Sequence, residues 1–294
     1  MKAYTKGVLN GILASVSYGT NPFFSLPMYS RGIGVNSVLF YRYFIASLVF
    51  FLWIKFVKKV SLKITVKEGF QLFALGLLFS LSSLTLFAAF SYIASGIACT
   101  ILFIYPIMVA LIMFIFYKEK ITKSVVFAIF LTSIGIMLLS KSTGKLNFHG
   151  IELVLLSALL YSLYIVFVNR IKSISQMQPE KLTFYVMLFG LMVYIVNLDF
   201  CTKLQPLTSS FLWLCALGLS LIPTIISVET INKAIRVIGS TKTAVLGALE
   251  PITANILGVI FFHEAMTLKI FIGICLIISG VMFIILHKDK HLTE

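Results

Sequence analysis

The chain has 294 residues, of which 60% are hydrophobic and 12% charged, and its mean hydropathy is +1.04. This composition lies far outside that of soluble globular domains and predicts an integral membrane protein. The net charge of +14 is divided among short Lys and Arg clusters between apolar runs. Such clusters are typical of loops at an anionic membrane surface, so we expect the lipid bilayer as a partner and no nucleic acid.

Ten apolar segments are each long enough to be a membrane-spanning helix, since about 20 residues cross the hydrocarbon layer. In chain order the predicted spans cover residues 7–29, 35–57, 69–90, 96–117, 124–140, 151–169, 182–199, 211–231, 241–262 and 270–286. With the N-terminus in the cytoplasm, eighteen Lys and Arg residues fall on the inner side and five on the outer side. This bias predicts cytoplasmic termini and a multi-pass protein of the bacterial inner membrane.

An internal repeat appears when the chain is aligned with itself at an offset of 145 residues. Eleven positions between Ser95 and Met137 are then identical, including the matches of Pro106 with Pro251 and of Gly135 with Gly280. We therefore expect two repeats, at residues 1–143 and 148–294, each with five helices. Because five is odd, the second repeat enters the membrane from the opposite side. The predicted fold class is an all-α integral membrane protein whose ten helices form two inverted five-helix repeats around a central cavity, a plan typical of secondary transporters.

Several short motifs, most of them present in both repeats, are typical of one transporter family. They are Tyr18-Gly19, Arg42, Tyr105-Pro106, Glu119, Gly135, Tyr161-Ser162, Glu250-Pro251, Glu264 and Gly280. On these motifs the chain resembles the EamA family of the drug/metabolite transporter superfamily over nearly its whole length. The resemblance implies a central cavity between two halves and the movement of small metabolites such as amino acids, often outward. Ser162 and Tyr18 depart from the family's usual aromatic-Gly and Trp residues.

Two prolines mark equivalent depths in the two repeats. Pro106 and Pro251 each remove a helix hydrogen bond and are expected to free carbonyls near Leu102 and Gly247. Paired interruptions of this kind point to a midplane binding site, although a packing kink or a hinge explains them equally well.

Charged residues inside the predicted spans are the next site candidates. Glu250 lies near the bilayer centre and could bind a proton or a substrate ammonium, or could make a structural hydrogen bond. Arg42 could bind a substrate carboxylate, pair with an acidic residue, or extend to the outer surface. Glu229 is expected to pair with Lys233 one turn later.

Uncharged polar residues complete the predicted cavity. Asn21, before Pro22, interrupts the first span, and Asn255 lies one turn beyond Glu250. The remaining candidates are tyrosines, which could line the cavity or simply pack or anchor the helices. They are Tyr18, Tyr105 and Tyr161.

These features predict a secondary transporter that moves small organic metabolites, such as amino acids, across the cytoplasmic membrane by alternating access, as an exporter. The alternative is an exchanger of nucleotide sugars or other phosphorylated or nucleoside metabolites, or an uptake carrier. An intramembrane enzyme or sensor is disfavoured, because no catalytic motif and no soluble output domain is present. We expect no catalytic residue, no cofactor and no metal site, since the four Cys residues are isolated. The protein is expected to be a monomer or a homodimer with a small-molecule substrate, and a proton could couple its transport.

Overall fold

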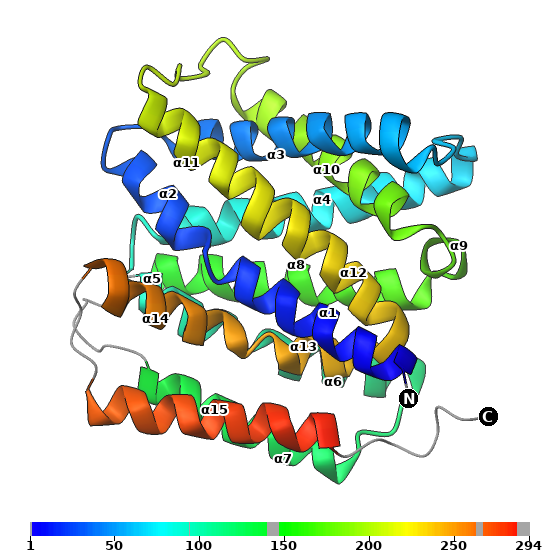
Figure 1. Ribbon diagram of the computed structural model, residues 1–294, viewed down its shortest axis with the longest axis vertical. Helices are drawn as coiled ribbons and strands as arrows, with labels where there is room; N and C mark the ends of the chain where they lie inside the picture. The colour runs from blue at the N-terminus through cyan, green and yellow to red at the C-terminus, as the bar shows by residue number, and fades with distance from the viewer. Residues whose placement is uncertain (1, 94, 140–146, 263–266, 287–294) are drawn as a thin grey trace.

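The computed structural model describes residues 2–93, 95–139, 147–262 and 267–286. Within these ranges the chain forms helices, turns and loops, with no strand. The helices pack side by side as a bundle, and the start of α1 and the end of α15 lie toward the same end of it (Figure 1). Some predicted features fall outside these ranges, namely Ser140, Lys141, Lys145, Glu264, Lys288 and Lys290.

The first part of the chain forms α1 (Lys2–Tyr18), α2 (Asn21–Tyr29), α3 (Val35–Leu52), the π-helix η1 (Trp53–Lys58), α4 (Val66–Ala89), α5 (Ser95–Leu102), α6 (Tyr105–Tyr117) and α7 (Lys123–Leu139). The second part forms α8 (Phe148–Arg170), α9 (Lys172–Ser175), α10 (Pro179–Asn197), α11 (Ser210–Ser220), the π-helix η2 (Leu221–Ile226), α12 (Ser227–Ile238), α13 (Ser240–Leu246), α14 (Leu249–Phe262) and α15 (Leu268–Leu286). Helices therefore occupy the ranges that hydropathy predicts, and several of them are interrupted.

Within the described residues, five helical segments are long and apolar enough to cross a membrane. They are Val35–Lys58, Val66–Ala89, Phe148–Arg170, Pro179–Asn197 and Ser210–Ile238. Shorter apolar helices cover Tyr105–Tyr117, Lys123–Leu138 and Leu268–Phe283. Large apolar side chains also remain on the outside, where Phe116 is 75% exposed and Leu214 is 65% exposed. An apolar exterior of this kind suits contact with lipid rather than water.

Helix ends follow local chemistry. Thr65 caps α4, because its hydroxyl accepts from the Glu68 N–H while the Glu68 carboxylate accepts from the Thr65 N–H at 2.7 Å. The helices before the predicted cytoplasmic loops end in left-handed residues, Lys59 at φ 51° and Lys118 at φ 53°. This reversal ends the helical hydrogen bonding and turns the chain back toward the bundle.

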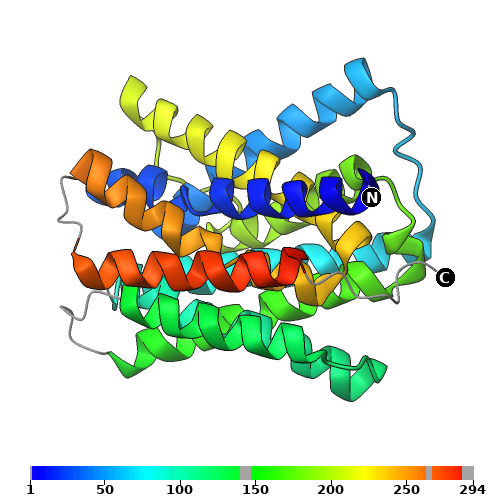
Figure 2. The same cartoon turned by 60° about the horizontal axis from the view of Figure 1, so that its bottom comes forward.

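The α7–α15 contact is reciprocal. A Cβ on Gly135 of α7 would lie 2.7 Å from the Gly273 carbonyl oxygen and 2.6 Å from the Ile277 side chain. A Cβ on Gly280 of α15 would lie 3.1 Å from the Ala128 carbonyl oxygen and 2.8 Å from the Thr132 side chain, the residues 145 positions before Gly273 and Ile277. Each glycine lets the other helix approach closely. Residues 145 positions apart thus make matching contacts on the two helices, which lie side by side (Figures 1 and 2).

Contacts between the two parts of the chain tie both ends of the bundle. At one end Gln205 makes four hydrogen bonds, to Gly32, Gly34, Ser37 and Tyr41. At the other end, an ion pair joins Arg170 to Glu119, Lys58 lies 3.3 Å from Glu180, and the Tyr185 hydroxyl donates to the Leu62 carbonyl at 2.5 Å. The two parts of the chain are thus in contact at both ends of the long helices.

Candidate functional site

A small cavity lies where three broken helices meet. The breaks separate α1 from α2, α5 from α6, and α13 from α14. The cavity has a volume of about 30 Å³, which is room for about two water molecules. Residues at all three breaks line it, with Leu86 and Phe90 from the end of α4: Tyr18, Gly19, Asn21, Pro22, Cys99, Leu102, Phe103, Tyr105, Glu250, Pro251 and Ala254.

A proline follows each of the three helix breaks. The second segment of each pair begins one or two residues before Pro22, Pro106 or Pro251, where a helix tolerates a residue without an N–H. The preceding residues turn tightly, as when the Gly247 N–H donates to the Ala244 carbonyl at 3.1 Å. The prediction of a free carbonyl at Gly247 is wrong, because this oxygen accepts a hydrogen bond from the Glu250 N–H at 2.9 Å. The turn recovers the hydrogen bond that an unbroken helix would have lost.

Glu250 and Tyr105 face each other at the cavity. The Tyr105 hydroxyl donates to Oε1 of Glu250 at 3.5 Å, and Tyr105 is 1% exposed. These two residues are 145 positions apart, so the repeat alignment makes them equivalent. Only a glycine at position 247 leaves room for Tyr105, since a Cβ there would overlap the Tyr105 hydroxyl. The α1–α2 break also lies close to the α13–α14 break, because a Cβ on Gly19 would lie 2.5 Å from the Glu250 carbonyl oxygen.

Three tyrosines form the wall beside Glu250. The rings of Tyr105 and Tyr161 meet edge to face with centroids 5.0 Å apart, and those of Tyr18 and Tyr161 stack at 6.2 Å. Tyr18 and Tyr105 line the cavity, whereas Tyr161 is buried behind them. The predicted tyrosines are therefore brought together, with Tyr161 supporting the two that face the cavity.

Arg42 lies behind Tyr18 and is fully buried. Its guanidinium carbon is 5.8 Å from the Tyr18 ring centroid and 5.5 Å from that of Phe87. Its Nε donates to the Thr224 hydroxyl at 2.6 Å, and its Nη2 lies 3.4 Å from the Pro223 carbonyl oxygen. Nη1 is buried without a hydrogen-bond partner, and no carboxylate in the described residues forms an ion pair with Arg42. Arg42 does not line the cavity, whereas Tyr18 beside it and Glu250 do.

The π-helix η2 creates the acceptors for Arg42. Pro223 has no N–H, so a helix cannot use it to satisfy the carbonyl of Leu219. The Thr224 hydroxyl donates to that carbonyl at 2.8 Å instead, and its oxygen then accepts from Arg42. π-Helical segments within longer helices are frequent at functional sites. The Pro223-Thr224 pair could have indicated this part of the site. Sequence analysis missed it, because hydropathy shows only a continuous apolar span there.

Unpaired polar atoms gather around Arg42 and along α2. Asn21 Oδ1, Ser25 Oγ and Tyr29 OH are buried without hydrogen-bond partners and recur at four-residue intervals on one face of α2. The Tyr29 ring contacts Phe87 at 6.5 Å, as Arg42 does at 5.5 Å. Buried polar groups normally have partners, so this cluster is suited to a polar ligand or to water.

The remaining candidates lie outside the cavity. Asn255 donates its side-chain N–H to the Pro251 carbonyl at 2.9 Å and does not line the cavity. Pro106 is buried at the start of α6 and is likewise not a lining residue. The searched part of the chain contains no group of three His, Cys, Asp or Glu residues able to hold a metal ion.

Comparisons with known proteins agree on one family. A model described as the EamA-like transporter family matches residues 5–141 and again residues 148–286. The chain is 26% identical over 198 residues to an uncharacterized transporter of Archaeoglobus fulgidus, covering 65% of this chain and 70% of that protein. It is 25% identical over 284 residues to the uncharacterized transporter YyaM of Bacillus subtilis, covering 92% and 91% respectively. A solved crystal structure shares the fold, with a TM-score of 0.79, 17% identity and 99% coverage of each chain. The chain belongs to the EamA-like transporter family and is a multi-pass membrane protein.

Proposed function

We propose that the chain is a secondary transporter that exports small zwitterionic metabolites, such as amino acids, across the cytoplasmic membrane by alternating access. One observation carries this proposal. Arg42, a fully buried cation without a carboxylate partner among the described residues, lies 5.8 Å from the Tyr18 ring centroid, and Glu250, a carboxylate, lines the cavity together with Tyr18. An amino acid carries the two complementary charges on groups that are bonded to the same carbon atom.

Arg42 supplies the carboxylate half of the proposed site. An arginine in the middle of a membrane helix costs about 2.5 to 3.5 kcal/mol on insertion scales, so it is retained where it meets a partner. Its unpaired Nη1 and the unpaired Ser25 and Tyr29 hydroxyls can all donate to an oxygen anion. A guanidinium also matches the planar geometry of a carboxylate. Movement of the Tyr18 ring would join this group of donors to the cavity.

Glu250 supplies the ammonium half. Its carboxylate lines the cavity, and its described hydrogen-bond donor is the Tyr105 hydroxyl at the long distance of 3.5 Å. This weak contact leaves Glu250 available for an ammonium group or a proton. The described lining contains no Lys or Arg, which disfavours the phosphorylated substrates of the alternative function.

Alternating access is supported by the packing of the two repeats. We propose ten spans, with α1–α7 and α8–α15 as inverted five-span repeats at residues 1–143 and 148–294. The reciprocal Gly135 and Gly280 contacts and the meeting of Tyr105 with Glu250 are the pattern that a two-fold axis between such repeats produces. The cavity of about 30 Å³ is too small for an amino acid, so the repeats must separate to admit one.

The proposed orientation places both termini in the cytoplasm of a bacterial inner membrane. The start of α1, the end of α8 and the start of α10 lie toward the same end of the bundle (Figure 1). Arg170, which pairs with Glu119, ends α8, and Glu180, which pairs with Lys58, is at the start of α10. Cationic loops at this end fit the positive-inside bias. A cysteine at position 3 reacting with an impermeant thiol reagent in intact cells would contradict this orientation.

Counterflow in proteoliposomes tests the proposed function. Vesicles loaded with an unlabelled compound are given labelled amino acids or nucleotides, and uptake by wild type is compared with that of Arg42→Ala and Glu250→Gln. A hydrogen bond to a charged group contributes about 1.5 to 3 kcal/mol, so each variant should bind its amino acid about 10- to 100-fold more weakly. Arg31→Ala and the exposed Glu152→Gln are matched controls and should transport normally.

Three results would contradict the proposal. Wild-type protein that moves no small metabolite contradicts the transporter function. Counterflow of nucleotides in place of amino acids contradicts the substrate class. Unchanged amino-acid affinity in both site variants contradicts the assignment of Arg42 and Glu250.

A further inference from the structure

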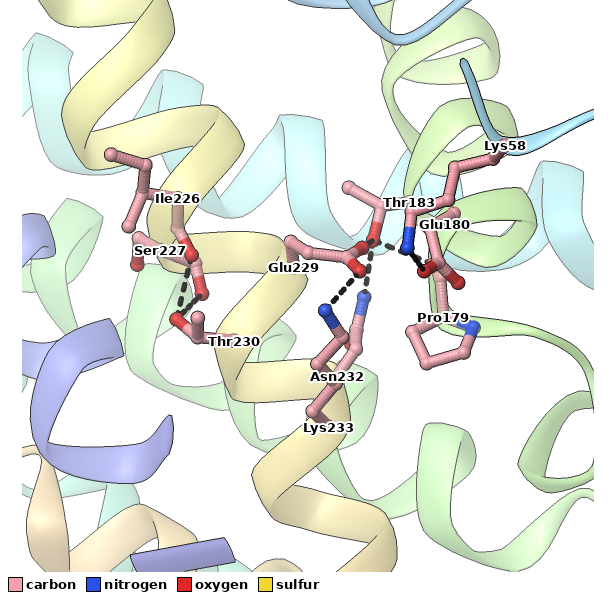
Figure 3. A network of polar contacts seen from close by, with 10 residues as sticks. All are labelled: Lys58, Pro179, Glu180, Thr183, Ile226, Ser227, Glu229, Thr230, Asn232 and Lys233. Carbon is pink, nitrogen blue, oxygen red and sulfur yellow. Dashed lines mark hydrogen bonds and ion pairs between the residues drawn. The ribbon is translucent and has the colours of Figure 1, made fainter. Parts of the chain in front are cut away.

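A second buried carboxylate lies away from the cavity, between α12 and α10. Glu229 is 5% exposed, and its Oε1 lies 2.8 Å from the Lys233 ammonium, as the sequence spacing predicts (Figure 3). Its Oε2 accepts from the Thr183 hydroxyl at 3.1 Å. Burying a carboxylate inside a membrane protein is costly, and such residues commonly lie on ion or proton pathways.

A series of hydrogen bonds leads from Tyr164 through Asn232 to Thr183, which lies beside Glu229. The Tyr164 hydroxyl donates to Asn232 Oδ1 at 2.8 Å, and Asn232 Nδ2 donates to the Thr183 hydroxyl oxygen at 3.1 Å. Thr183 lies within hydrogen-bond distance of Oε2, and the Lys233 ammonium forms an ion pair with Oε1. The chain of donors crosses α8, α12 and α10 and fits a carboxylate, which only accepts. A protonated Glu229 would be a donor and would conflict with this order.

Thr183 gives the group a second arrangement. Its hydroxyl lies 3.1 Å from Glu229 Oε2 and 2.9 Å from the Pro179 carbonyl oxygen, and its one hydrogen can favour either acceptor (Figure 3). When Glu229 takes up a proton, the new O–H can donate to Thr183, whose hydrogen then turns to Pro179. Lys233 loses its anionic partner, but its side chain is 35% exposed and can be solvated. One proton therefore switches the bonding between α12 and α10.

The same helix connects this switch to the proposed substrate site. Thr224, which holds Arg42, precedes Glu229 by five residues, or about one and a half helical turns. The π-helix η2 lies on this stretch and ends where α12 begins. A second connection runs through stacked rings, since Tyr164 lies 6.3 Å from Tyr161 between ring centroids. A substrate at Arg42 and a proton at Glu229 can thus bias the position of one helix.

The charges around Glu229 decide how it titrates. On α12 itself they come from Lys233 and the partly buried Arg236, while α1 packs against α12 and carries the exposed Lys6. Across the interface they come from the Glu180 carboxylate, which Lys58 pairs at 3.3 Å, and from the Tyr164 hydroxyl. Lys58 balances Glu180, which leaves Lys233 as the ion-pair partner of Glu229 in the described structure.

We propose that Glu229 binds the proton that couples transport to the pH gradient, with Lys233 and Thr183 as its positioning residues. In the coupling step the carboxylate of Glu229 gains one proton from the solvent side through the exposed end of Lys233, and the same proton leaves after the helix has moved. The proposal rests on the transporter function and leaves Glu250 for the substrate.

Two transport measurements separate coupling from translocation. Proteoliposomes receive the labelled amino acid that wild type exchanges fastest, first by counterflow at equal pH and then under a one-unit pH gradient with the membrane potential clamped. One coupled proton then gives about tenfold accumulation. Glu229→Gln should keep counterflow and lose accumulation, and Thr183→Val should reduce accumulation more than counterflow. Glu180→Gln is the matched control and should keep both activities.

Accumulation by Glu229→Gln at the wild-type level would overturn the proposal. If Glu229→Gln loses counterflow as well, or if wild type moves no amino acid, infrared titration of the protein in liposomes decides. A carboxylic-acid band that appears on acidification in wild type and in Glu250→Gln, and is missing from Glu229→Gln, supports the proton site. The same band in all three proteins overturns it. Failure of transport by wild type therefore counts against the proposed function without deciding the proton site.

Discussion

Replacing Arg42 by methionine tests whether this buried cation lacks a partner in the folded protein. Methionine has a similar length and can pack against the surrounding rings through its sulfur. The substitution removes the hydrogen bond to Thr224 at 2.6 Å, a charge-assisted bond that contributes about 1.5 to 3 kcal/mol. It also removes the cost of holding an arginine inside the membrane, about 2.5 to 3.5 kcal/mol. The two changes nearly cancel, so Arg42→Met should change the free energy of unfolding by only about 1 kcal/mol.

An ion-paired Arg42 would behave differently. Breaking a buried pair from one side costs about 3 to 5 kcal/mol, because the remaining charge is left uncompensated. Thr224 does not become an orphan in Arg42→Met, since its hydroxyl still donates to the Leu219 carbonyl. The two cases therefore differ by several kcal/mol.

Thermal unfolding in detergent measures this difference. A thiol-reactive dye can report unfolding through the buried Cys215. With about 2 to 4 °C of midpoint shift per kcal/mol, Arg42→Met should unfold within about 4 °C of wild type while losing amino-acid counterflow. A fall of about 10 °C or more would refute the reasoning, because it would mean that Arg42 holds the folded structure through an ionic partner.

Three further predictions concern helix packing and one ion pair. Gly135→Leu and Gly280→Leu should each destabilise the protein by about 1 to 3 kcal/mol, and by similar amounts, because their contacts are reciprocal; unequal midpoints of thermal unfolding would count against the two-fold relation. Gly247→Ala should lower counterflow by displacing the tyrosine hydroxyl beside it, whereas Gly69→Ala, whose Cβ would meet only one atom at 3.7 Å, should transport like wild type. Glu119→Gln should lower the midpoint of thermal unfolding by at most about 4 °C. Its ion pair with Arg170 is partly exposed, and such pairs contribute up to about 1 kcal/mol.

The positions of the helices could be predicted because the bilayer imposes a simple rule of length and hydropathy on each segment. Two of the three breaks at the cavity were also predictable, since Pro106 and Pro251 recur at a fixed offset in the repeats. The sequence could further indicate an interruption at Asn21-Pro22. Its meeting with the other two breaks depends on how the helices pack, which a single sequence does not encode in any local pattern.

The side chains of the site were predicted less well, because each depends on the rotation of its helix and on its nearest acceptor. Asn255 was expected in the cavity, but its amide finds the Pro251 carbonyl one turn earlier, a common local bond for Asn. Arg42 was recognised as unusual, yet its link to Thr224 joins segments 182 residues apart and has no local signature. Ser25 and Tyr29 were missed because their importance comes only from the partners they lack.

The meeting of Tyr105 with Glu250 bears on why the two proposed repeats are joined in one polypeptide. Two copies of a half-length chain, related by a two-fold axis, would bring identical residues together at this point. Two glutamates would repel each other, and two tyrosines would offer no charge. After gene duplication and fusion, the two positions can change independently, and a donor can then stand opposite an acid. A single chain thus permits a chemical asymmetry at its centre that a symmetric dimer of identical subunits cannot encode.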